Sequence, residues 1–526
     1  MIDAIIIGGG HNGLVCANYL AMAGKKVKIF ESRGIIGGAA VTEEFHPGFR
    51  NSVASYTVSL LNPKVISDLE LNKYGLQIVH RKVNNFWPHK NGNCLAFLLD
   101  DNELRKEISQ FSREDSKALD RYFRDINMVA DLIREFLLET PPNVGSGIKE
   151  IFKTIKFGNR LRKLSIEDQR IVMDIFTKSV SDFLNNYFEN QYVKGAFAFD
   201  GIVGNYASSE TPGSAYVLMH HAFGEVNGVR GVWGHAIGGM GSITDAMSKS
   251  AAAKDVEIVL GTSVKRVIIK NNKACGVLLD NGDMEEAKII VSNLNPSLLY
   301  NQLIREGEVP LDFSRRMKNY KNGSGTFRMN VALDKLPEFT CLNNQLRTNL
   351  DYLTGGIIIA PTCEYIDKAY LDSKLNGWSK EPIVEMLIPT TLDKTLAPEG
   401  KHVASLFCQQ FDPDVDWDSN REEVADLIID TVEIYAPGFK NSILGKQIFS
   451  PLDLERVFGL VKGDIMHGNM SLDQIFSARP MIGYGNYRSP IKNLYLCGAG
   501  THPGGGVTGA PGHNAAYEIL KDFKRF

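Results

Sequence analysis

The sequence lacks an excess of either charge. Its 526 residues include 58 Lys and Arg against 61 Asp and Glu, so the formal net charge is −3. Proteins that hold nucleic acid generally present a strong basic field, and this balance argues against a nucleic-acid partner. The length also exceeds what one hydrophobic core ordinarily supports, which predicts two domains.

Closely spaced cysteine pairs are missing as well. A scattered, odd number of cysteines without a CxxC pair argues against a disulfide framework, a structural zinc site and dithiol catalysis. We therefore expect no metal and mostly buried, inert thiols. The seven residues are Cys16, Cys94, Cys275, Cys341, Cys363, Cys408 and Cys497.

Long apolar runs and hydrolase motifs are absent too. No run approaches the roughly 18 residues of a membrane-spanning helix, and a strand pattern begins at Asp3, where a signal peptide would stand. We therefore expect a cytoplasmic protein. The chain contains neither GxSxG nor HExxH, which disfavours a hydrolase.

One segment nevertheless leaves a membrane contact open. Residues 148–164 hold six Lys or Arg and one Glu, and Ile148, Ile151, Phe152 and Ile155 recur at helical spacing. A basic amphipathic helix can lie on an anionic bilayer. The alternatives are a weak contact with a membrane surface and a solvated lid helix over the active site.

The amino-terminal residues have the pattern of a βαβ unit. Asp3–Ile7 is an apolar run typical of a buried parallel strand, a helical stretch follows, and Lys25–Phe30 predicts a second strand. The turn after the first strand has the GxGxxG spacing, with glycines at Gly8, Gly10 and Gly13. In this context the glycines allow a tight turn, close approach to a pyrophosphate and close helix packing.

Two further features complete a dinucleotide fingerprint. Glu31 ends the second strand, where an acidic side chain accepts hydrogen bonds from ribose hydroxyls. His11 and Asn12 stand at the start of the helix, whose free N–H groups suit a pyrophosphate. The fingerprint does not distinguish FAD from NAD.

The next residues, ESRGIIGGAAVT, distinguish the two cofactors. They resemble the extended pattern of amine oxidase and phytoene desaturase flavoproteins, in which a second glycine pair passes beneath the flavin phosphates. Many members carry an arginine where this chain has Ala39, so that contact is absent or replaced. The resemblance implies FAD contacts from Ser32, Arg33, Gly37, Gly38, Ala39, Ala40 and Val41, with Arg33 a candidate for the adenosine side.

The carboxyl-terminal segment NLYLCGAGTHPGGGVTGAPGHNAA holds seven glycines in fifteen residues. Such density costs backbone entropy, and it is tolerable where a ligand needs close backbone approach. A helix that starts near Val507–Gly509 would place its positive end beside a reduced flavin. Gly504, Gly506 and Gly509 also match GxGxxG, but too few residues follow for another nucleotide fold. The expected cofactor residues are Gly498, Gly500, Thr501, Gly506, Val507 and Thr508.

These motifs together resemble the phytoene desaturase and carotenoid isomerase family of FAD enzymes. HNGLVCANYLAMAGKKVKIFE and HGNMSLDQIFSARP are closer still to the branch that includes pyridine nucleotide-disulfide oxidoreductase domain-containing protein 2. The resemblance covers effectively the whole chain. It implies FAD and a backbone contact from Val264 to the adenine. Cys497 is a candidate for a covalent link to the flavin, but its expected position in a buried strand favours non-covalent FAD.

The same resemblance implies the fold. We expect an α/β protein in which a Rossmann-type FAD-binding domain is interleaved with a mixed-sheet and helical substrate domain. The expected domains are 1–75 with 225–300 and 450–526, and 76–224 with 301–449. Residues 101–190 have helical periodicity and Val256–Ser292 predicts a β-meander, while later strands are expected at Thr326–Leu333, Ile383–Ile388 and Val403–Phe407.

The implied activity is an FAD-dependent dehydrogenase or oxidase that moves a hydride from carbon of a hydrophobic organic substrate to flavin N5. With no second nucleotide domain expected, oxygen or a quinone is the expected electron acceptor. A redox-neutral isomerase and a non-catalytic flavoprotein that serves as an interaction partner remain alternatives, and a homo-oligomer stays open.

Catalytic residues are harder to find, because the cofactor supplies most of the chemistry. His467 is our candidate for the substrate face, Arg479 for binding a substrate carboxylate or a flavin oxygen, and His502 for the flavin loop. For each of the three, a loop residue satisfied by backbone groups is the alternative.

Overall fold

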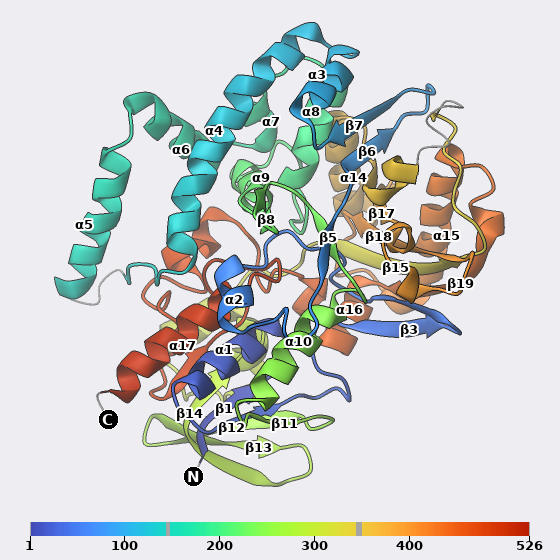
Figure 1. Ribbon diagram of the computed structural model, residues 1–526. Helices are drawn as coiled ribbons and strands as arrows, with labels where there is room; N and C mark the ends of the chain where they lie inside the picture. The colour runs from blue at the N-terminus through green and yellow to red at the C-terminus, as the bar shows by residue number, and fades with distance from the viewer. Residues whose placement is uncertain (1, 144–147, 343–349, 525–526) are drawn as a thin grey trace.

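The computed structural model describes residues 2–143, 148–342 and 350–524, and Figure 1 shows helices packed around two large β-sheets. The first sheet has the strand order β11-β2-β1-β14-β13-β12, and β20 also pairs with β14. Its parallel strands are β1 (Ile2–Ile7), β2 (Val27–Phe30), β11 (Glu257–Val259), β14 (Met284–Ser292) and β20 (Leu494–Leu496).

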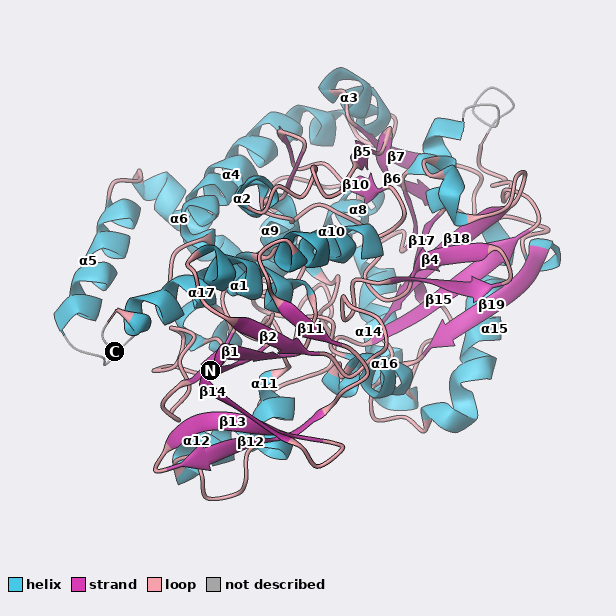
Figure 2. Ribbon diagram, turned by 60° about the horizontal axis from the view of Figure 1, so that its bottom comes forward, coloured by secondary structure: helices cyan, strands magenta, loops and turns pink. Residues whose placement is uncertain are grey.

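The predicted βαβ unit is confirmed. β1 lies between β2 and β14, and its apolar run Ala4–Ile7 is buried on both faces, as parallel strands generally are. Helix α1 (His11–Met22) crosses from β1 to β2 and packs against α10 (Gly241–Ala252) and α17 (Ala510–Phe523). Figure 2 shows these three helices side by side over one face of the sheet.

The meander prediction is only partly right. β12 (Val264–Lys270), β13 (Lys273–Leu279) and β14 are joined antiparallel, and Asn271 and Asn272 form the first turn with positive φ. The first expected strand, β11, does not belong to the meander. It pairs in parallel with β2, because α10 carries the chain back to that open edge before β11 begins.

The second sheet has the order β19-β15-β18-β17-β16-β6-β7 and is antiparallel except where β16 meets β6. One set of buried side chains joins it to α15 (Trp417–Tyr435). This mixed sheet agrees with the predicted fold class. Its strands are β6 (Val83–Pro88), β7 (Cys94–Leu98), β15 (Thr326–Leu333), β16 (Gly356–Ile359), β17 (Ile383–Leu387), β18 (His402–Gln409) and β19 (Ile443–Phe449).

A helical layer stands beside the second sheet (Figure 1) and shares one apolar core with the inner faces of β6 and β7. Its helices are α3 (Asp101–Ser109), α4 (Arg113–Leu137), α5 (Ile148–Arg162), α6 (Ile166–Thr177), α7 (Val180–Leu184), α8 (Gln191–Ala198) and α9 (Ser214–Ala222). Side-chain caps from Ser112 and Ser165 begin α4 and α6. Among the described residues, no helix is both long and apolar enough to cross a bilayer.

Short elements connect these layers. They are β3 (Thr42–His46), β4 (Phe49–Ser52), α2 (Pro63–Asp68), β5 (Ile78–His80), β8 (Glu225–Val226), β9 (Val229–Arg230), β10 (Gly234–Ala236), α11 (Pro296–Leu298), α12 (Leu311–Lys318), α14 (Cys363–Asn376) and α16 (Pro451–Phe458). The chain passes repeatedly between the two sheets, so segments distant in sequence meet at their border. The discontinuous domain boundaries given above remain our proposal.

Candidate functional site

The carboxyl end of β1 borders a cavity of about 430 Å³. The first glycine turn and the residues that follow β2 line part of it, and the carboxyl-terminal glycine loop lines another part. Segments from the second sheet and from α16 also reach it. A ligand pocket outside the carboxyl ends of parallel strands is the usual arrangement in open α/β sheets.

The glycines of the first turn allow neighbouring segments of the protein to pack closely against it. A Cβ on Gly10 would lie 2.8 Å from the side-chain nitrogen of Asn293, and a Cβ on Gly13 would collide with the carbonyl of Gly8. The second glycine pair closes on this turn, since the Gly37 N–H donates to the Gly9 carbonyl at 3.0 Å. Two segments nearly thirty residues apart therefore form one cradle of bare backbone.

Glu31 is held rigidly at the edge of the cradle. Its carboxylate accepts hydrogen bonds from the N–H groups of Gly9 at 2.7 Å and Arg33 at 2.9 Å. The side chain is buried and lines the cavity, where the sequence predicted a ribose contact. The backbone N–H of Gly9, in the glycine turn, helps to orient the Glu31 carboxylate. The carboxylate and the glycine turn are therefore held in a fixed relative position.

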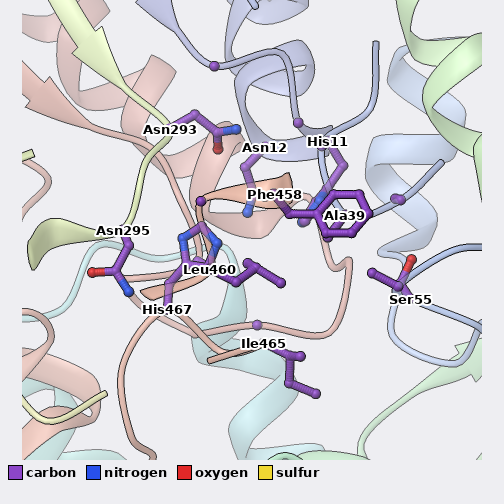
Figure 3. Close-up of a pocket in the computed structure, with 18 of the residues that line it drawn as sticks. His11, Asn12, Ala39, Ser55, Asn293, Asn295, Phe458, Leu460, Ile465 and His467 are labelled. Atoms are coloured by element: carbon purple, nitrogen blue, oxygen red, sulfur yellow. The ribbon is translucent and has the colours of Figure 1, made fainter. Parts of the chain in front are cut away.

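Several buried polar atoms of the cavity wall have no partner within the described part of the chain. They are His11 Nε2, Asn12 Oδ1, Arg33 Nη1, Ser55 Oγ and His467 Nδ1. Figure 3 shows four of these side chains, those of His11, Asn12, Ser55 and His467, around the cavity. Buried polar atoms are normally hydrogen-bonded, so this wall suits a ligand rich in polar groups, as a dinucleotide is.

Another part of the wall is aromatic. The ring of Tyr56 stacks on Phe407 with centroids 4.9 Å apart, and His221 stacks on Trp233 at 6.2 Å. Apolar neighbours complete this part of the lining, namely Leu60, Val203, Ile465 and Met466. An apolar and aromatic wall with a few polar groups is typical of a small-molecule site.

Behind the aromatic wall lies a buried charge cluster that the sequence analysis missed. The Tyr56 hydroxyl donates to Glu385 Oε2, and the guanidinium of Arg328 lies 4.8 Å from the Tyr56 ring. Burial raises the pKa of Glu385, while hydrogen bonding to Tyr56 and the charges of Arg81 and Arg328 lower it. Burial raises the pKa of Asp200 to about 7, and the charge of Glu385 contributes to that shift. The sequence feature that could have revealed this cluster is Glu385, the one charged residue in the apolar strand IVEML.

The structure brings most predicted cofactor residues together. Those that line the cavity are Gly8, Gly10, His11, Asn12, Glu31, Ser32, Arg33, Gly38, Ala39, Ala40, Val264, Gly506 and Val507, with His467 among the catalytic candidates. The predicted residues outside its lining are Gly13, Gly37, Val41, Gly498, Gly500, Thr501 and Thr508, with Arg479 and His502. Several of the latter are packing positions: a Cβ on Gly498 would lie 2.6 Å from the Asn293 carbonyl.

The side chain of Arg479 is satisfied by backbone carbonyls, which is the alternative that the sequence left open. Its buried guanidinium donates to the carbonyls of Met466 at 2.6 Å, Gln474 at 2.9 Å and Ala499 at 3.0 Å, and it also reaches Asn469 and Gly468. These donors are therefore engaged by the protein. This arrangement favours the alternative of a loop residue satisfied by backbone groups over the binding of a substrate carboxylate or a flavin oxygen.

His502 and His467 have different positions. His502 Nε2 donates to the Phe136 carbonyl at 3.1 Å and its ring meets Phe476 edge to face, away from the cavity lining. His467 lies in a loop with a positive φ of 57°, and Tyr320 donates to its carbonyl at 3.1 Å. Of these two histidines only His467 lines the cavity.

Comparison with known proteins agrees with this geometry. The family model described as flavin containing amine oxidoreductase matches residues 13–327. Pyridine nucleotide-disulfide oxidoreductase domain-containing protein 2 of Rattus norvegicus is 38% identical over 545 residues, covering 99% of this chain and 94% of that protein. Phytoene desaturase (lycopene-forming) of Pseudescherichia vulneris is 25% identical over 528 residues, covering 97% of this chain and 96% of its own.

A solved structure shares the fold. Cyclohexylamine oxidase from Brevibacterium oxydans IH-35A aligns over 100% of both chains with a TM-score of 0.60. The sequence identity is 15%, so this likeness concerns the fold alone.

Proposed function

Because this chain belongs to the flavin containing amine oxidoreductase family, it is an FAD-dependent oxidoreductase, and we propose that it dehydrogenates a hydrophobic organic substrate at carbon. Bound FAD supplies the acceptor for a hydride from that carbon. The protein's task is then to hold the cofactor, orient the substrate and exclude water.

One observation carries this proposal: a single cavity joins the dinucleotide cradle to an aromatic and apolar wall. Gly10 and Glu31 belong to the cradle, and Phe407 and Met466 belong to the wall. A substrate held against that wall would share the cavity with the cofactor.

Dehydrogenation releases a proton as well as a hydride, and we propose that Tyr56 and Glu385 accept it. The Tyr56 hydroxyl donates its hydrogen to Glu385, which leaves its oxygen lone pairs available to a substrate group. As the substrate proton moves to the Tyr56 oxygen, the phenolic proton can move to the carboxylate. Tyr56 ends the step as a neutral phenol, Glu385 ends it as a neutral carboxylic acid, and the proton has left the reacting group.

For the oxidative half of the cycle we propose oxygen or a quinone as electron acceptor. The supporting observation is in the sequence, where the amino-terminal fingerprint is the one glycine motif followed by a second strand and an acidic residue. A nicotinamide cofactor would need a comparable unit of its own.

The first test is an absorbance spectrum of the purified protein. It is followed by anaerobic reduction with dithionite and readmission of air. Flavin bands that bleach and return quickly support an oxidase, and a slow return directs the search toward quinones. Flavin that resists reduction favours a non-catalytic flavoprotein, and bleaching by substrate without net turnover favours an isomerase. A colourless protein that takes up no added FAD contradicts the proposal.

We also propose a weak contact between the α5–α6 arm and an anionic membrane surface. Ile151, Ile155 and Ile166 are exposed on this arm, and Arg162 and Lys163 are exposed beside them. The side chains of Ile148 and Phe152, which the sequence placed on the same face, lie outside the described residues. Apolar groups beside cations suit the headgroup region of a bilayer.

A further inference from the structure

Two histidines from distant segments line the FAD cavity. His11 is the first residue of α1, and His467 follows α16 in a loop that Tyr320 and Asp464 hold in place. Figure 3 shows both imidazoles beside the cavity together with Asn12. Each ring has one buried nitrogen without a partner in the described structure, Nε2 in His11 and Nδ1 in His467.

Both imidazoles are neutral in these surroundings. Burial lowers the pKa of His11 to about 3, with a smaller contribution from the charge of His467. Burial likewise lowers the pKa of His467 to about 4, and the charge of Arg479 adds to this effect. An uncharged imidazole can still donate or accept a hydrogen bond, and it can gain a positive charge when an anion approaches.

The fixed cations of the cavity wall already have acidic partners. Arg33 pairs with Glu43 at 2.7 Å, and Arg456 pairs with Asp418 at 2.6 Å. Ala39, in the second glycine segment, brings no charge. The cavity also holds Glu31, which is acidic. The two negative charges of a diphosphate therefore meet the positive end of α1 and these two neutral rings.

We propose that His11 and His467 bind the diphosphate of FAD and that FAD binding is coupled to the uptake of a proton by this pair. His11 occupies the helix start where the fold receives a pyrophosphate, and His467 faces it across the same cavity. His467, which the sequence suggested for the substrate face, is thus assigned to cofactor binding instead. The proposal concerns the affinity for FAD, so its test is independent of the proposed reaction.

The direction of the pH effect follows from linkage. An adjacent anion raises the pKa of an imidazole, so each ring has a higher pKa with FAD bound than without it. The resulting affinity is present at low pH and is lost as pH rises through the raised pKa of the complex. FAD should therefore bind more tightly at pH 6 than at pH 8.

Other ionisable groups near the pair do not reproduce this effect. The guanidinium of Arg479, beside His467, is held by backbone carbonyls. Burial raises the pKa of Tyr320 to about 12, and it keeps the pKa of the cavity-lining His221 at about 4. Asp464 is buried and accepts hydrogen bonds from the N–H groups of Met466 and Gly468. A change in the protonation of Asp464 would affect the loop equally in the natural protein and in the His467 variant. It would therefore not produce a difference between the two proteins.

The test is serial dilution of the holoenzyme from pH 6 to pH 8, with released FAD measured by its fluorescence. We expect the dissociation constant of the natural protein to rise about tenfold over this range. His467→Asn keeps a residue that tolerates the positive φ but removes the titrating group. Its dissociation constant should change less with pH, because only His11 can still take up a proton, and it should lie close to the weaker, high-pH value.

A matched control and a second readout complete the test. His402→Asn changes a histidine outside the cavity lining and should keep the natural pH dependence. The ³¹P resonances of bound FAD should shift between pH 6 and pH 8 in the natural protein, and the shift should be smaller in His467→Asn. If that variant fails to fold, His11→Gln serves instead. A natural protein whose FAD affinity is independent of pH, or a variant that keeps the full dependence, would overturn the proposal.

Discussion

The hydroxyl of Tyr56 donates to Glu385 Oε2 at 2.5 Å, which connects the cavity wall to a carboxylate buried in β17. The two residues are 329 positions apart in the sequence. Burial raises the pKa of Tyr56 well above that of a free phenol, so the hydroxyl stays protonated and acts as the donor. The Tyr56 oxygen can therefore accept a hydrogen bond from a substrate bound against the aromatic wall.

Replacing Tyr56 with Phe tests the proposed proton acceptor. The ring and its stacking on Phe407 are kept, but the oxygen is lost. We expect flavin reduction by substrate to slow by about 10²- to 10⁴-fold, the usual worth of a general base. FAD content and the flavin spectrum should stay unchanged. Anaerobic stopped-flow absorbance measures the rate, and natural reduction kinetics in the variant would remove Tyr56 from the mechanism.

Gly10→Ala tests the cradle. The added Cβ would lie 2.8 Å from the Asn293 amide and would project where the diphosphate backbone contact is needed. We expect FAD affinity to fall by at least about tenfold, corresponding to roughly 1.4 kcal/mol. Gly34→Ala is the matched control, because its Cβ would meet no atom within 4 Å. Equal affinities in the two variants would contradict the assignment.

Arg479→Met tests the structural role of that arginine. The change leaves several buried carbonyls without donors, and each unpaired group costs about 1–3 kcal/mol. We expect the free energy of unfolding to fall by about 3–5 kcal/mol in urea titrations. Arg315→Met, at an exposed ion pair with Asp312, should change it by less than about 1 kcal/mol.

Asp200→Asn tests the buried acidic cluster through pH. Burial raises the pKa of Asp200 from 3.8 to about 7, with Glu385 adding to the shift. The folded protein therefore holds a proton that the unfolded chain has already lost, and this group destabilises the fold increasingly as pH rises from 4 to 7. We expect the variant to have a higher Tm than the natural protein at pH 8 and the same Tm at pH 4. A difference of equal size at both pH values would exclude this cause.

Ile151→Glu with Ile155→Glu tests the membrane contact. Both side chains are more than half exposed, at 57% and 52%. We expect the natural protein to cosediment weakly with anionic liposomes at low salt and the double variant to stay in solution. Leu311→Glu changes an exposed leucine on α12, outside the arm, and should keep the natural behaviour. A natural protein that does not cosediment would contradict the contact.

Local sequence patterns alone predicted the core of the cofactor half. The βαβ unit, the glycine turn and Glu31 lie within the first 31 residues, so short-range periodicity and turn chemistry specify them. β15 was predicted at its observed bounds because polar and apolar side chains alternate along Thr326–Val331, which is the period of a strand.

Tertiary structure decided the rest of the site. The approach of Tyr56 to Glu385 and of His11 to His467 depends on chain crossings between two sheets, which no local pattern records. The role of Arg479 depends on which carbonyls surround its guanidinium, and the sequence does not show these neighbours. A dinucleotide site was therefore predictable from nearby residues, and the resemblance to flavoproteins identified FAD, whereas the substrate wall and the charges behind it arise from long-range packing.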